Sequence, residues 1–103
     1  MINQTNSKES LLNKGKTAFN GENYKDAFFN FTELISQDPK NSDVFKWRGR
    51  AFMGMEKYAE ALYDFSYSIM LEKKKDEEPD KEADKKKLSE YHCYAGQCHF
   101  ELG

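Results

Sequence analysis

The chain has 103 residues, room for a single domain, and its formal net charge of −2 lacks the basic excess typical of nucleic-acid-binding proteins. Charged residues make up 33% and aromatic residues 15%, which favours a folded chain with solvated outer faces over disorder. No stretch approaches the roughly 18 apolar residues of a membrane span, and no secretory signal pattern is present, so we expect a cytoplasmic protein.

Apolar residues at helical spacing predict four helices in the first three quarters of the chain, at about 8–20, 24–37, 43–54 and from about 58 onward. Ser7 should cap the first helix, after a flexible segment 1–6, and Ser42 should cap the third. Asp38 and Pro39 mark the turn after the second helix. Short connections between these helices require antiparallel neighbours.

Charged residues replace the apolar period from Glu72 to Lys87. Such a run is typical of a solvated face or a flexible insertion, and contact of its lysine triplets with an acidic surface is the alternative. Pro79 suits the first turn of a helix. The last helix is therefore predicted to begin near Asp80 and to be unusually long.

Two stretches of the chain repeat each other with a period of 34 residues. A period of this size is typical of units that cannot bury their apolar faces alone and that stack into one continuous core. Glycine inside a helix costs about 0.5–1 kcal/mol relative to alanine, so a recurring glycine predicts close approach of a neighbouring helix. The recurring residues are Gly15, Glu22, Tyr24, Ala27, Phe31 and Ile35, matched by Gly49, Glu56, Tyr58, Ala61, Phe65 and Ile69.

The first two copies carry a bulky apolar residue, then a glycine, then an alanine and a phenylalanine at the same offsets, and a third copy begins in the same way. These positions are Leu11, Gly15, Ala18, Ala27, Phe31 and Pro39 in the first copy, Phe45, Gly49, Phe52, Ala61 and Phe65 in the second, and Tyr91, Gly96 and His99 in a third. The pattern resembles the tetratricopeptide-repeat family over about residues 7–103. The third copy lies 47 residues after the second, so 13 residues are inserted before it.

The resemblance implies an all-α fold in which antiparallel helix-turn-helix repeats stack as a short right-handed solenoid of about two and a half repeats. The recurring small and aromatic residues are then expected to pack in the core. The predicted units are flexible residues 1–6, repeats at about 8–41 and 42–75, a charged insertion at about 73–88 and a partial third repeat at 89–103.

The resemblance also implies that the first helix of each pair lines a concave groove that binds a partner protein or peptide. Lys16, Lys46 and Arg50 beside Trp47 would suit a peptide with acidic and apolar residues. The alternative for Trp47 is that it covers a neighbouring helix. The expected groove residues are Leu12, Asn13, Lys16, Lys46, Trp47, Arg50, Tyr94 and Gln97.

Family members that hold the acidic tails of heat-shock chaperones use a clamp of Lys, Asn and Arg side chains. The matching positions here carry Leu12, Lys16, Trp47, Glu90 and Tyr94. Only a lysine remains, where the clamp has asparagine, and Glu90 would repel a carboxylate. The sequence therefore disfavours binding of chaperone tails.

No catalytic signature is present, so we expect no enzyme activity, no cofactor and no small-molecule substrate. Cys93 and Cys98 are five residues apart, which places them about 140° apart around a helix and predicts that they do not bridge. The same geometry argues against a metal site that combines them with His92 and His99.

The last helix does not have the polar outer face of a terminal cap. We expect this uncapped end to bind a partner or to self-associate, through Tyr91, Cys98, Phe100 and Leu102. The protein is interpreted as a protein-interaction scaffold or assembly subunit. A chaperone-linked adaptor is the alternative, as is the N-terminal part of a longer protein in a cytoskeletal or ciliary complex.

Overall fold

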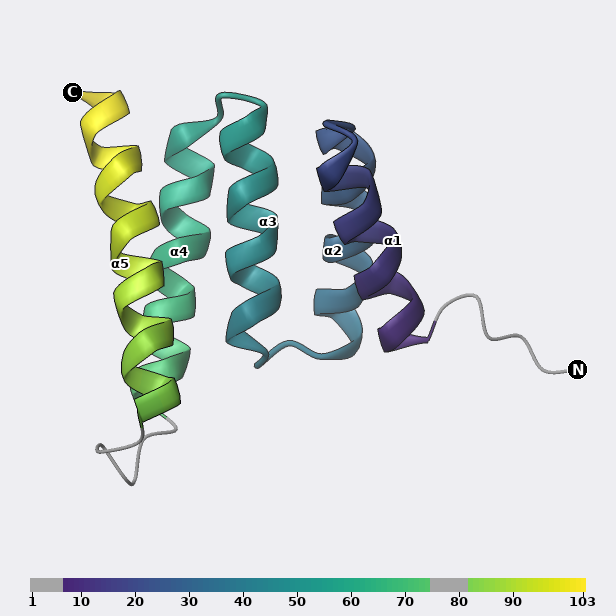
Figure 1. The fold of residues 1–103 in the computed structure, drawn as a ribbon, viewed down its shortest axis with the longest axis horizontal. Helices are drawn as coiled ribbons and strands as arrows, with labels where there is room; N and C mark the ends of the chain where they lie inside the picture. The colour runs from purple at the N-terminus through teal and green to yellow at the C-terminus, as the bar shows by residue number, and fades with distance from the viewer. Residues whose placement is uncertain (1–6, 75–81) are drawn as a thin grey trace, which may run out of the picture.

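The computed structural model describes residues 7–74 and 82–103, and the described residues form helices without any strand. The helices are α1 (Lys8–Asn20), α2 (Tyr24–Gln37), α3 (Ser42–Gly54), α4 (Tyr58–Lys74) and α5 (Glu82–Leu102). Successive helices run in alternating directions and pack side by side in chain order (Figure 1). The all-α antiparallel array predicted from the sequence is therefore confirmed.

The array is a slab 43 × 35 × 19 Å in size, and its short dimension equals about two helix diameters. The first two helices form one pair and α3 and α4 the next, with α5 at the end of the row (Figure 1). This arrangement is compatible with stacked helical repeats, and the right-handed sense of a solenoid stays a prediction.

The two helix pairs are closed by the same contact, made between a glycine and a phenylalanine. A Cβ atom built on Gly15 would lie 2.4 Å from the Phe31 ring, and one on Gly49 would lie 2.7 Å from the Phe65 ring. Both rings are fully buried. Glycine recurs at this position because any larger residue would meet the aromatic ring of the second helix.

The turn inside each pair contains one residue with a left-handed backbone conformation. Gly21 does not carry the unusual backbone conformation; Glu22 does, with a φ of 62°, and so does Glu56, with a φ of 60°. This left-handed conformation costs a side-chain-bearing residue about 1–2 kcal/mol. The 34-residue period thus extends to a strained turn residue.

Helix starts agree with the sequence at α1 but not at α3. Ser7 caps α1 by accepting a hydrogen bond from the Ser10 amide at 3.2 Å. At α3 the cap is Asn41, whose side chain accepts from the Asp43 amide at 3.0 Å, and Ser42 lies inside the helix with its side chain buried. The last helix begins at Glu82, and Pro79 and Asp80 fall outside the described residues, as do 1–6 and residues 75–81 of the predicted insertion.

Candidate functional site

Arg50 lies at the meeting point of three helices. Its guanidinium carbon is 4.7 Å from the ring centre of Phe19 on α1, 4.8 Å from that of Trp47 on α3 and 5.2 Å from that of Tyr94 on α5. A guanidinium within about 6 Å of an aromatic ring is attracted to the face of the ring. The sequence predicted that the first helices of the repeats share one surface, and Arg50 joins all three of them.

A cleft of about 300 Å³ opens beside Arg50. Four of its eight lining residues are aromatic, and its exposed lining is slightly more polar than apolar, so it suits a segment that carries both kinds of group. We call it the Arg50 cleft. Its lining residues are Phe19, Tyr24, Arg50, Met53, Gly54, Tyr58, Tyr94 and Gln97.

Arg50 makes ring contacts but no ion pair or hydrogen bond with another side chain in the described part of the chain. The neighbouring arginine differs in this respect, because Arg48 donates two hydrogen bonds to Asp64, at 2.8 and 2.9 Å. Two arginines two residues apart therefore have different roles. Arg48 is tied to a buried carboxylate within the fold, whereas the donors of Arg50 remain available to a ligand.

Trp47 combines the two alternatives that the sequence left open. Its ring covers the core, with centres 5.6 Å from Phe19 and 5.9 Å from Phe31. The ammonium groups of Lys16 and Lys46 also lie over it, at 5.3 and 4.9 Å from the ring centre. The indole is thus a packing residue that also holds a group of cations at the surface.

The predicted groove residues do not all reach one surface. Arg50, Tyr94 and Gln97 line the Arg50 cleft, Trp47 and Lys16 adjoin it, and Asn13 is exposed on α1. Leu12 packs instead against the core of the first repeat. Lys46 is only 8% exposed and forms an ion pair with Glu90 at 3.6 Å.

The uncapped end was predicted wrongly at two of its four residues. Tyr91 and Cys98 are fully buried, whereas Phe100 is 82% and Leu102 51% exposed. Residues 91, 95 and 98 follow a helical spacing of four and three, so they share one face, which packs into the core with α4. The apolar residues of α5 therefore divide between a buried face and an exposed one. Cys93 is exposed, and both cysteines are free, as the sequence predicted.

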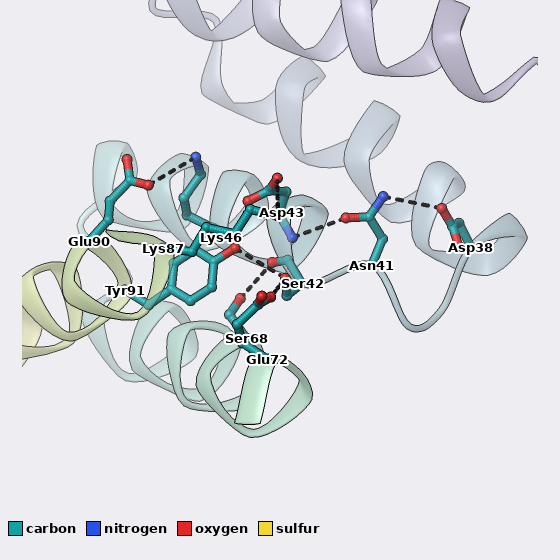
Figure 2. Close-up of polar contacts among 10 residues, drawn as sticks. All are labelled: Asp38, Asn41, Ser42, Asp43, Lys46, Ser68, Glu72, Lys87, Glu90 and Tyr91. Atoms are coloured by element: carbon teal, nitrogen blue, oxygen red, sulfur yellow. Dashed lines mark hydrogen bonds and ion pairs between the residues drawn. The ribbon is translucent and has the colours of Figure 1, made fainter. Parts of the chain in front are cut away.

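A buried polar network, which the sequence analysis missed, fixes α5 against α3 and α4 (Figure 2). The Tyr91 hydroxyl donates to Asp43 at 2.6 Å and lies 3.1 Å from the Ser42 hydroxyl. Ser42 in turn donates to Glu72 at 2.6 Å, and Ser68 donates to the Ser42 carbonyl at 2.9 Å.

Glu72, placed by the sequence analysis at the start of the solvated charged run, is 1% exposed. The burial of Glu72 is indicated in the sequence by its spacing. Four residues follow one another at intervals of four, three and four along one helix face: Ala61, Phe65, Ser68 and Glu72.

The network shifts the acidity of two of its members. Burial raises the pKa of Asp43, but the hydrogen bond from Tyr91 and the charges of Lys87 and Lys46 outweigh it, so the pKa lies below its usual value. Lys87 makes an ion pair with Asp43 at 3.6 Å. Burial and the neighbouring Asp43 carboxylate raise the pKa of Tyr91. Its hydroxyl therefore stays protonated and donates a hydrogen bond to Asp43. These groups hold the helices together.

A second cleft, also missed, lies between α2 and the end of α3. It has a volume of about 570 Å³ and is lined by Lys25, Phe28, Phe29, Phe52, Met55, Lys57 and Glu60. Phe29 is more than half exposed there. The repeat counterparts of Phe28 and Phe29 are Leu62 and Tyr63, which keep their apolar and aromatic character, and Tyr63 is exposed as Phe29 is.

Comparison with known proteins gives one partial likeness. Over 68 residues, 62% of this chain, the sequence is 31% identical to the protein named DnaJ homolog subfamily C member 7 homolog from Dictyostelium discoideum. The chain spans 13% of the length of that relative. No protein-family model matches the sequence. Among the described helices, none is long and apolar enough to cross a membrane.

Proposed function

We propose that this protein is a non-enzymatic interaction module of the tetratricopeptide-repeat type, which serves as a scaffold or assembly subunit. It binds a segment of a partner protein in the Arg50 cleft. The observation that carries this proposal is Arg50 itself, a guanidinium held by three aromatic rings from three helices and not paired with a carboxylate in the described chain.

The chemistry of the cleft indicates the kind of segment. A guanidinium positioned by ring contacts has lost much of its conformational freedom before a ligand arrives and can donate two parallel hydrogen bonds to one carboxylate. The walls formed by Phe19, Tyr58 and Met53 suit an apolar side chain. A peptide with an Asp or Glu next to a bulky apolar residue meets both requirements.

Trp47 provides the measurement, because it is the sole tryptophan of the chain and contacts Arg50. A synthetic peptide with alternating Glu and Leu should change its fluorescence in a saturable titration, and the same peptide with Gln in place of Glu should bind about tenfold or more weakly. Arg50→Met should reduce the affinity of the Glu peptide to a similar extent. Lys25→Met, on the exposed face of α2, is the matched control and should leave it unchanged.

Equal binding of the Glu and Gln peptides would show that Arg50 does not recognise a carboxylate. Failure of both to bind would remove the cleft as the site.

A chaperone-linked adaptor that binds acidic peptide tails is the second candidate, supported by the partial likeness to a DnaJ homologue. The positions that would form a two-carboxylate clamp argue against it, since Leu12 packs in the core and the Glu90 carboxylate lies beside Lys46. Low-micromolar binding of a peptide with an acidic C-terminal tail, abolished by Lys16→Ala, would establish this function instead of the first.

The setting of the protein is a separate part of the proposal. The relative that it resembles is several times longer, so the chain can correspond to the repeat portion of a larger protein. A cytoplasmic location, with a cytoskeletal or ciliary complex as one setting, is tested by crosslinking and affinity purification from cells. Crosslinks on Lys16 and Lys46 would support the cleft; crosslinks confined to residues 73–87 would place the interaction on the charged segment.

A further inference from the structure

The three equivalent glycines of the chain have different surroundings. A Cβ on Gly15 would meet the Phe31 ring at 2.4 Å and a Cβ on Gly49 would meet the Phe65 ring at 2.7 Å, whereas a Cβ on Gly96 would meet no atom within 4 Å. In the first two repeats the following helix thus supplies the ring that covers the glycine. On α5 the same position is bare.

Gly96 lies on the side of α5 that faces away from the array. Tyr91, Ala95 and Cys98 face the rest of the protein, and α5 forms the end of the row of helices (Figure 1). The opposite side carries Gly96 with Phe100 one turn later, and the Phe100 side chain is 82% exposed. We define the Gly96 face as His92, Gly96, His99 and Phe100, all of them exposed.

We propose that the Gly96 face binds an amphipathic α-helix of a partner protein, and that this helix places an aromatic ring on Gly96 as α2 does on Gly15 and α4 on Gly49. The two internal interfaces define the occupant: an alanine, then a phenylalanine four residues later, as in Ala27 and Phe31. The Gly96 face continues that series of interfaces by one more position.

The polar residues of the face refine the chemistry of the partner. His92 and His99 lie four residues before and three residues after Gly96, as Phe45 and Phe52 lie around Gly49. Imidazole groups there favour carboxylate or amide side chains, so the partner helix differs from α2 and α4 in carrying Glu, Asp or Asn beside its central aromatic residue.

A second copy of the chain does not supply such a helix. The alanine and phenylalanine of both matching helices are fully buried within their own repeats, at Ala27, Phe31, Ala61 and Phe65. The Gly96 face also shares no residue with the Arg50 cleft, whose two α5 residues, Tyr94 and Gln97, lie about 160° and 100° from Gly96 around the helix axis. The two surfaces can therefore be tested independently.

The chain itself provides the sequence of a probe. A fluorescein-labelled peptide with the sequence of residues 58–74 contains the required alanine and phenylalanine, and its binding to the 103-residue protein can be followed by anisotropy. We expect saturable binding that weakens about tenfold or more when the peptide carries Phe65→Ala. Tyr67 packs on Phe45 in the second repeat, at 4.6 Å between ring centres, so a Tyr67→Glu peptide would face His92 and should bind about two- to fivefold more tightly.

Variants of the protein locate the binding. Gly96→Leu fills the bare position without a clash in the free protein, so it should fold normally and bind the peptide at least tenfold more weakly. Thr17→Leu, which adds a leucine at an exposed position of α1, is the matched control and should bind normally. Trp47 fluorescence with the Glu and Leu peptide should be the same in Gly96→Leu and in the unaltered protein.

Peptide binding that is absent, or equal in Gly96→Leu and the unaltered protein, would overturn the proposal and leave the Arg50 cleft untouched. Concentration-dependent dimerisation of the protein alone, abolished by Gly96→Leu in sedimentation, would also overturn it by assigning the face to a second copy.

Discussion

Gly49→Ala and Gly96→Ala should change stability in opposite directions, although both replace the same repeat position by the same residue. At Gly49 the added methyl group would lie 2.7, 2.9 and 3.0 Å from three carbon atoms of the Phe65 ring, which is fully buried and cannot move into solvent. Overpacking of this kind costs about 1–3 kcal/mol. The higher helix propensity of alanine returns about 0.5–1 kcal/mol, so Gly49→Ala should lower the free energy of unfolding by about 0.5–2 kcal/mol.

At Gly96 only the propensity contributes, because no atom lies within 4 Å of the added group. Gly96→Ala should therefore raise the free energy of unfolding by about 0.5–1 kcal/mol. Urea denaturation followed by far-UV circular dichroism measures both changes, and a difference of 1 kcal/mol shifts the melting temperature of a domain of this size by about 4–8 °C. Two changes of the same sign would refute the argument that the Phe65 ring accounts for the glycine.

Three further predictions concern the ion pair of Arg48 with Asp64, the two cysteines and the Asp43 carboxylate. Arg48→Ala should lower the free energy of unfolding by about 3–5 kcal/mol in urea denaturation, because Asp64 is 1% exposed and would lose its partner. The double variant Arg48→Met with Asp64→Leu should restore most of the lost stability, and a double variant as unstable as Arg48→Ala would contradict this reasoning. With a thiol reagent Cys93 should react quickly, and Cys98 only on unfolding, because Cys98 is buried and burial raises the pKa of its thiol; rapid reaction of two thiols in the native protein would show that α5 is not packed as described. The pKa of Asp43 is lowered in the folded state, so the ionised carboxylate stabilises the fold fully above about pH 4, and this stabilisation is lost as the pH falls through the lower pKa. Between pH 6 and pH 2 the free energy of unfolding should therefore fall more steeply in the unaltered protein than in Asp43→Asn. Equal slopes in the two proteins would exclude the effect.

Repetition in the sequence predicted the helices because it reports packing directly. Helix α3 begins and ends 34 residues after α1, and α4 begins 34 residues after α2. Phe31 and Phe65 close the two pairs by the same contact with a glycine. A residue that recurs at a fixed offset has the same neighbours each time. Fold and core therefore follow from one sequence without a structure.

Residues outside the repeat were harder to predict, since their partners are distant in sequence. Ser42 was expected to cap a helix because serine is a common cap, but its hydroxyl donates to Glu72, 30 residues later. Tyr91 was assigned to an exposed end because the face that α5 buries depends on Asp43 and Ser42, neither of which has a repeat counterpart that signals it. The charge of Glu72 also led to a wrong prediction of exposure, because its position around the helix places it on the buried face.

The same long-range bonds account for the position of the candidate site. In the first two repeats a glycine and a phenylalanine set the distance between paired helices, but Gly96 makes no such contact, and α5 is held on its other side by Tyr91, its hydroxyl 2.6 Å from Asp43. That attachment brings Tyr94 against Phe65, with the rings stacked at 5.2 Å, and under the Arg50 guanidinium. The buried network thus holds α5 against the preceding helices, which places Tyr94 in the wall of the Arg50 cleft and leaves the Gly96 face uncovered.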